Sequence, residues 1–206
     1  MEVEGISIDT NAEVVSKLSF SREGENWESI SSSEGDFVVA IDCTQNEAIL
    51  GAGKARELIT HIQKLRKNAG LDLKDVVEYF FEENEAVSIM ESAVSTNVDT
   101  FRNKFKGIVP VPKRFTPKWA VPVISEKVNI GGADVEVSIV RPALAARDDL
   151  DELSSTYLST IDPFSVKAED VLSFTVDGVS HTLHKGKDFW GCTTAKLEAT
   201  KGVSWL

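Results

Sequence analysis

The chain has 206 residues, of which 33 are acidic and 22 are Lys or Arg, so its formal net charge is −11. Hydrophobic residues make up 42% of the chain and charged residues 27%, proportions that are typical of a globular protein with a buried core. These totals argue against indiscriminate nucleic-acid binding, and no apolar run approaches the roughly 20 residues of a membrane-spanning helix.

The N-terminal residues and the cysteines indicate the cellular compartment. Residues 1–4, Met-Glu-Val-Glu, lack the apolar region of a secretory signal. Cys43 and Cys192 stand far apart, and neither has a metal-type partner nearby in the sequence. We therefore expect two free thiols in a reducing compartment, and a cytoplasmic protein.

The chain begins with a polar arm and a β-hairpin. Residues 1–26 are weakly patterned, and we interpret them as an N-terminal arm. Residues 27–31 and 36–43 then predict two strands that are joined by a turn at 34–35. Alternation along the second strand places one set of side chains on a common face, which we expect to be buried. That set is Phe37, Val39, Ile41 and Cys43.

A long helix follows, and it carries the most unusual charge pattern of the chain. Thr44 and Glu47 have the spacing of a capping box, and Gly70 stands where a glycine commonly ends a helix. Apolar residues recur at helical spacing, at Ala55, Leu58, Ile59, Ile62 and Leu65. From Lys54 to Lys67 the helix has five Lys or Arg residues and one acid. A basic face in an acidic chain indicates a polyanion as partner, although such charges are often only solvated.

Another strand and another helix complete the first predicted domain. Residues 75–82 are rich in aromatic and β-branched side chains, which favours a strand. Asn84 can cap a second helix, whose apolar face would carry Val87, Met90, Val94, Val98, Phe101 and Phe105. Strand, strand, helix, strand, helix is the order of an α+β domain, which we assign to residues 27–107.

The composition changes over residues 102–118, which hold six Lys or Arg residues, three prolines and no acid. Proline removes a backbone donor and restricts the preceding residue, so regular structure throughout is excluded. We predict a Pro-rich basic linker at residues 108–118. Aromatic side chains interleave with these charges and could stack on unpaired bases, although two of them also suit the core. They are Phe101 and Phe105, which fit the helix stripe, and Phe115 and Trp119.

The rest of the chain, residues 119–206, predicts two hairpins on either side of a helix. Residues 121–140 turn at Gly131-Gly132, and residues 171–184 turn at Asp177-Gly178. Two-residue turns there would place Val128 opposite Val135 and Phe174 opposite His181. The helix lies at residues 148–160. Hairpin, helix, hairpin is the order of a ubiquitin-like β-grasp, so the predicted fold is α+β with two small domains.

The patterns of common catalytic and metal sites are absent from the sequence. His181 and His184 are three residues apart in a predicted strand and therefore point to opposite faces. The acidic run at 148–152 is typical of the first turn of a helix. The Gly-Ala-Gly-Lys run at 51–54 lacks the spacing of a phosphate-binding loop. We predict no catalytic residue, no metal site and no cofactor in this chain.

Residues 55–71 have a long pattern. It consists of Ala-Arg-Glu, two apolar residues, two further residues, and then Ile-Gln-x-Leu-Arg-Lys-x-Ala-Gly-Leu. With the strand at 36–42, this pattern closely resembles the C-terminal region of isoleucyl-tRNA synthetases, and the detailed match covers about residues 35–85. The remainder resembles the extension of cytosolic eukaryotic members. These class I enzymes attach isoleucine to tRNA with ATP, but their His-Ile-Gly-His and Lys-Met-Ser-Lys-Ser signatures are absent here. The resemblance implies a fragment whose catalytic domains, and the ATP site, lie upstream of Met1.

The resemblance and the basic segments together predict a non-catalytic module that contacts tRNA(Ile) by neutralising its phosphates. The residues that we expect to do so are Lys54, Lys64, Arg66, Lys67, Lys104, Lys106, Lys113 and Arg114. The alternative is a protein-assembly or dimerisation module of the same synthetase. In that case the second domain would bind a protein partner or another copy through a strand edge, with aromatic residues near the C-terminus in the contact. Those residues are Phe189, Trp190 and Trp205.

Overall fold

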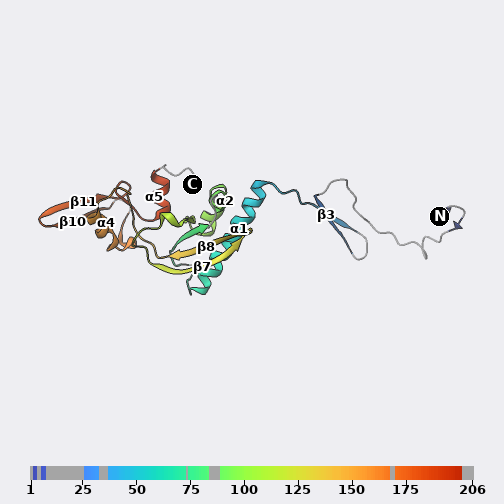
Figure 1. Ribbon diagram of the computed structural model, residues 1–206, viewed down its shortest axis with the longest axis horizontal. Helices are drawn as coiled ribbons and strands as arrows, with labels where there is room; N and C mark the ends of the chain where they lie inside the picture. Colours follow the sequence, from blue (N-terminus) through green and yellow to red (C-terminus); the bar gives the residue numbers. More distant parts are fainter. Residues whose placement is uncertain are drawn as a thin grey trace. The chain divides into compact units, whose positions relative to one another are not determined.

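The structure is a computed structural model that describes residues 2–3, 6–7, 26–32, 37–72, 74–83, 89–167 and 170–200. The chain divides into two compact units, Met1–Asn46 and Glu47–Leu206 (Figure 1). The secondary structure is mixed, with α-helices and several small β-sheets, so the α+β class is confirmed.

The first unit contains two short antiparallel pairs of strands. Strands β1 (Glu2–Val3) and β2 (Ile6–Ser7) form one pair. Strands β3 (Trp27–Ser31) and β4 (Val38–Asp42) form the predicted hairpin. The predicted turn at 34–35 and most of the predicted arm lie outside the described residues.

The expected burial of one face of β4 is wrong. Phe37, Val39 and Ile41 are 61%, 46% and 59% exposed. Two strands form only one layer, and the described part of this unit supplies no second layer to cover them. Alternation therefore identified the common face correctly but not its burial. Cys43 is also exposed, and both it and Cys192 are free thiols as expected.

The second unit begins with helix α1 (Glu47–Asn68), whose predicted apolar stripe is buried in full. The predicted capping role of Thr44 is wrong, because α1 begins only at Glu47, three residues further on. The Thr44 hydroxyl and backbone N–H instead donate to the Asp42 carboxylate. The predicted end of the helix is confirmed, since Gly70 has a positive φ of 67°. Such a backbone conformation favours glycine, which has no Cβ to clash.

A four-stranded sheet lies against this helix, in the order β6-β5-β8-β7. Its strands are β5 (Glu78–Glu83), β6 (Val111–Pro112), β7 (Pro122–Ile130) and β8 (Ala133–Val140). Strands β7 and β8 form the predicted hairpin in the predicted register, with Val128 opposite Val135. Strand β5 pairs with β8 antiparallel and with β6 parallel.

The predicted second helix is divided into α2 (Ile89–Thr96) and α3 (Val98–Lys104), with residues 84–88 outside the described part. Asn97 stands between them and donates from its side chain to the Ala93 carbonyl at 2.8 Å. Of the expected apolar positions, Met90, Val94, Phe101 and Phe105 are buried in the core and Val98 packs against it, whereas Val87 lies outside the described residues. One hydrophobic core contains residues of α1, α2, α3 and the sheet.

Residues 108–118 differ from the linker that we predicted. They contain strand β6 and a 3-10 turn, η1 (Lys113–Phe115), and both Val109 and Val111 are buried. The strands before and after them, β5 and β8, pair in one sheet around one core. The structure therefore shows no domain division there, because Val109 and Val111 pack into the core.

The last part of the chain adds a smaller core next to the sheet. Its elements are β9 (Ala145–Ala146), α4 (Glu152–Ser159), η2 (Pro163–Ser165), β10 (Val171–Val176), β11 (Val179–His184), β12 (Phe189–Trp190) and α5 (Thr193–Thr200). The β10–β11 hairpin has the predicted register, with Phe174 opposite His181. It forms a sheet separate from that of β7 and β8. A β-grasp arrangement is thus not formed by the described strands, because β8 has β5 as its second neighbour.

A buried carboxylate, Glu78, joins strand β5 to two later segments of the chain. It accepts hydrogen bonds from the backbone N–H of Thr193 at 2.7 Å and from that of Ala143 at 3.4 Å. Burial raises the pKa of Glu78 above its ordinary value, and the two N–H donors act in the opposite direction. Glu78 therefore holds the first residue of α5 and the segment after β8 against strand β5.

Candidate nucleic-acid interface

The exposed side of α1 carries the basic residues that the sequence singled out. Lys64 and Lys67 are exposed near its C-terminal end, where positive charge also suits the helix dipole. Lys54 lies about 15 Å further back along the helix axis. Its stem covers the β7–β8 turn so closely that a Cβ on Gly131 would lie 2.7 Å from Lys54 Cε. Lys54 is therefore separate from the basic residues at the C-terminal end of α1.

Arg66 has a structural contact that the sequence did not reveal. Its guanidinium donates to the hydroxyl of buried Tyr79 at 2.7 Å and to the carbonyls of Asp72 and Asp75. Burial raises the pKa of Tyr79, and the charge of Arg66 partly offsets that effect. Arg66 thus ties the end of α1 to the loop before β5, with its charge beside that loop.

A small cavity of about 190 Å³ lies where the end of α1, the loop before β5 and the end of α3 meet. We call it the basic groove. Its charged lining residues are four cations and one acid, namely Arg66, Lys74, Lys104, Lys106 and Asp75. Gln63, Tyr79 and Phe105 also line it. Lys64 and Lys67 come directly after the lining residues Gln63 and Arg66 in the sequence of α1. Of the predicted residues, the structure therefore brings Arg66 of α1 together with Lys104 and Lys106 from the end of α3, while Lys54, Lys64 and Lys67 do not line the groove.

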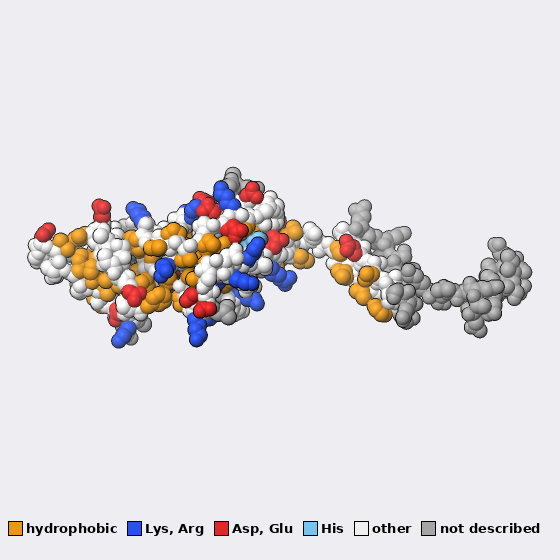
Figure 2. Space-filling view, turned by 90° about the horizontal axis from the view of Figure 1, so that it is seen from below, with side chains coloured by type: hydrophobic (Ala, Val, Ile, Leu, Met, Phe, Trp, Pro, Cys, Tyr) orange, Lys and Arg blue, Asp and Glu red, His pale blue; other side chains and the backbone are white. Residues whose placement is uncertain are grey.

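Figure 2 shows how charged side chains are distributed on one face. Lys and Arg side chains gather over the part of the second unit that carries α1, with single Asp and Glu side chains among them (Figures 1 and 2).

Lys74 belongs to the groove but was missed by the sequence analysis. It is a single cation between a helix and a strand, so no periodic pattern points to it.

Lys113 and Arg114 do not line the basic groove. Lys113 Nζ lies 2.7 Å from Glu82 and 3.2 Å from Glu136, and these carboxylates raise its pKa. Arg114 donates both terminal nitrogens to Glu91, and its guanidinium carbon lies 4.7 Å from the centre of the Phe115 ring. These ion pairs were not predicted, because the carboxylates come from other elements. Both cations are already neutralised where they lie.

Within the described ranges, no group of three or more His, Cys, Asp or Glu side chains is arranged to hold a metal ion. The described helices include none with the length and apolarity needed to cross a bilayer. His181 stacks on Phe174 with ring centres 4.8 Å apart, as its cross-strand position suggests.

Comparison with known proteins relates the chain to part of an aminoacyl-tRNA ligase, although no protein-family model matches it. The chain is homologous to a small region of isoleucine–tRNA ligases. It is 31% identical to the cytoplasmic enzyme of Arabidopsis thaliana over 132 residues, which cover 58% of this chain and 11% of that protein. The probable cytoplasmic enzyme of Dictyostelium discoideum is 36% identical over 76 residues, 37% of this chain and 7% of that protein.

The bacterial isoleucine–tRNA ligase of Porphyromonas gingivalis is 30% identical over 99 residues, which cover 48% of this chain and 8% of that protein. The chain thus spans about a tenth of the length of these relatives. The resemblance that the α1 segment suggested is confirmed at this level.

Proposed function

We propose that this chain is a non-catalytic part of an isoleucine–tRNA ligase and that it contacts tRNA(Ile) through the basic groove. The homology supplies the context, since the relatives carry isoleucine and tRNA in their names. The observation that carries the contact is the convergence of four cations around one groove in a chain with a net charge of −11. ATP and the attachment reaction would belong to the rest of the ligase, and the cytoplasm is the compartment of the relatives so named.

The chemistry of the groove suits a phosphate backbone. Lys64, Lys67, Lys74 and Lys104 are exposed and make no side-chain hydrogen bond or ion pair within the described part of the chain. Each ammonium group can replace a condensed counterion on RNA, and release of that ion favours binding. Such contacts position RNA without reading its sequence, which suits a supporting module rather than a catalytic one.

The other predicted residues have different positions in this proposal. Arg66 adds its charge to the groove while it holds Tyr79. Lys113 and Arg114 would have to leave their carboxylate partners before they could reach a phosphate. Exchanging one charge-assisted contact for another yields little net free energy. We therefore assign the contact to the groove and to the exposed lysines beside it.

The experiment is a measurement of tRNA(Ile) affinity at several salt concentrations. Lys64→Ala with Lys67→Ala should weaken binding and reduce the slope of log affinity against log salt by about two, because each lysine releases about one counterion. The matched control is Lys167→Ala with Lys187→Ala, which removes the same charge from exposed positions outside the groove. An equal loss in both double variants, or no loss in either, would contradict the proposal.

The assembly alternative has less support. Phe189 and Trp190 are 0% and 7% exposed, so they pack in the second unit and offer no contact surface. Trp205 lies outside the described residues. The aromatic residues that motivated this alternative therefore do not favour it.

A further inference from the structure

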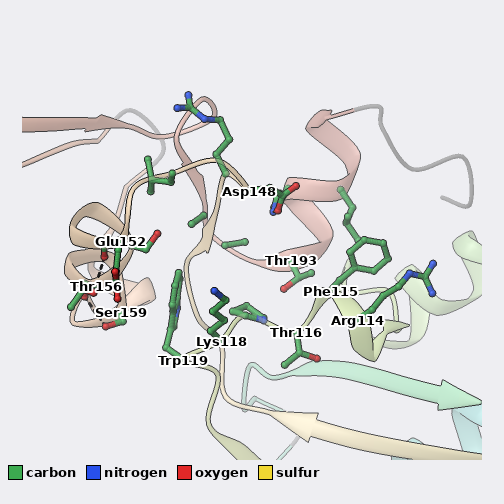
Figure 3. Close-up of a pocket in the computed structure, with 18 residues that line it drawn as sticks. Arg114, Phe115, Thr116, Lys118, Trp119, Asp148, Glu152, Thr156, Ser159 and Thr193 are labelled. Atoms are coloured by element: carbon green, nitrogen blue, oxygen red, sulfur yellow. Dashed lines mark hydrogen bonds and ion pairs between the residues drawn. The ribbon is translucent and has the colours of Figure 1, made fainter.

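A larger cavity, of about 750 Å³, lies between α4 and α5 (Figure 3). We call it the α4 cavity. Its walls come from η1 and the residues up to Trp119, from β9 and the segment after it, from α4, and from the first turns of α5. The volume is within the range of sites that hold small organic molecules. Elements that are far apart in the sequence thus line one cavity. This cavity shares no lining residue with the basic groove.

The wall formed by α4 is a stripe of hydrogen-bonding side chains. Glu152, Ser155, Thr156 and Ser159 all line the cavity, and their spacing places them on one face of the helix. The hydroxyls of Thr156 and Ser159 donate to backbone carbonyls of the preceding turn, at 2.8 Å and 2.7 Å. Their oxygen lone pairs can therefore accept hydrogen bonds from a ligand. This stripe is suited to the polar edge of a planar group.

Next to that stripe stand a flat aromatic side chain and a lysine. In Figure 3, Trp119 and Lys118 lie beside each other between α4 and the start of α5. Trp119 is half-buried, and Lys118 is exposed. An indole face provides a stacking platform for a planar ring, and an ammonium group provides a partner for an anion. The hydrogen-bonding stripe on α4, the Trp119 ring and Lys118 therefore all line the same cavity.

The charges around the cavity leave Lys118 as the available cation. Arg147 binds Asp149 and Asp188, while Lys196 binds Asp148. Arg114, as described above, binds Glu91. Lys118 has no ion pair within the described ranges. An anionic group in the cavity would therefore be attracted chiefly to Lys118.

Two polar atoms of the same wall lack hydrogen-bond partners. Thr116 Oγ1 and Trp119 Nε1 are both buried and make no hydrogen bond with any described residue. Buried polar groups without partners are rare, because each costs about 1–3 kcal/mol of free energy. Both residues line the cavity, and Trp119 also packs against the smaller core.

We infer that the α4 cavity binds a single nucleotide of an unpaired RNA strand, with its base stacked on Trp119 and its phosphate next to Lys118. The stripe on α4 accepts hydrogen bonds from the exocyclic amino group or the 2′-hydroxyl of that nucleotide. Unpaired bases can enter such a cavity, whereas bases inside a duplex are covered by their neighbours. The inference rests on the proposed contact with RNA and adds a site that distinguishes unpaired from paired strands.

The test compares a short fluorescent single-stranded RNA with a blunt duplex of the same sequence, both titrated with the full chain. Trp119→Leu should weaken binding of the single strand about tenfold, because stacking of one base is lost, and leave the duplex unchanged. Trp119→Phe should restore most of the affinity, since it keeps an aromatic face. Lys118→Glu, at an exposed position, should weaken single-strand binding without affecting the fold, and Lys167→Glu is its matched control.

Thermal melting of each variant separates loss of binding from loss of folding. If folded Trp119→Leu and Lys118→Glu bind the single strand as tightly as the parent chain, the inference is wrong. If Lys64→Ala with Lys67→Ala affects neither RNA while Trp119→Leu weakens the single strand, the cavity stands and the basic groove fails. If the parent chain binds neither RNA, both proposals fail. Binding of an acidic peptide in the cavity in place of single-stranded RNA would also overturn the nucleotide assignment.

Discussion

Replacing Phe80 with alanine should lower the free energy of unfolding by about 3–5 kcal/mol, the usual cost of removing a buried aromatic ring. Phe80 lies in the middle of β5 and is 1% exposed. Its neighbours on the adjacent strands are Val111 of β6 and Ser138 of β8. Phe80 therefore lies in a sheet that contains strands from before, within and after residues 108–118. Urea denaturation of the parent and the variant measures the change.

The matched control is Phe164→Ala, because the Phe164 side chain is 65% exposed. Removing it should change the free energy of unfolding by less than about 0.5 kcal/mol. A loss below about 1 kcal/mol for Phe80→Ala would contradict the central position of β5. So would a separate unfolding transition for the residues that follow Lys118, since one shared sheet requires that they unfold with β5.

Replacing Arg66 with alanine should lower the free energy of unfolding by about 1.5–3 kcal/mol, the range for a charged hydrogen-bond partner of a buried group. The change leaves the buried Tyr79 hydroxyl without its partner and releases the carbonyls of Asp72 and Asp75. Because Arg66 also lines the basic groove, an RNA-binding defect in this variant must be compared with its stability.

A double-mutant cycle with Tyr79→Phe measures the pair directly. The two changes should be non-additive by about 0.5–3 kcal/mol, because each removes the same hydrogen bond. Arg56→Ala is the control, since Arg56 is an exposed arginine of the same helix without a side-chain hydrogen bond to any described residue. Additive effects of Arg66→Ala and Tyr79→Phe would show that Arg66 does not act through Tyr79.

The features that the sequence predicted well depend on local signals. The buried stripe of α1 follows from helical spacing, and Gly70 marks its end through the conformation that only glycine adopts easily. The registers of β7–β8 and β10–β11 follow from two-residue turns at Gly131 and Asp177, which bring fixed positions into opposition. Each signal lies within a few residues of the feature that it determines.

The features that the sequence did not reveal depend on distant partners. The pairing of β5 with β8 joins strands on opposite sides of a proline-rich segment, and its composition suggested a linker instead. The carboxylates that bind Lys113 and Arg114 come from β5, β8 and α2, and no spacing rule connects them. The basic groove was foreseen only as a set of charges, because its shape arises where α1 and α3 end together.

The central claim is that RNA covers the basic groove, and lysine footprinting with tRNA(Ile) tests it most directly. The full chain is acetylated with and without tRNA, and mass spectrometry gives the modification rate of each lysine. We expect tRNA to slow acetylation of Lys74 and Lys104, which line the groove, and of Lys64 and Lys67, which follow lining residues of α1 in the sequence. Lys167 and Lys187 should be unchanged. Unchanged rates at the groove, or protection confined to Lys167 and Lys187, would contradict the account.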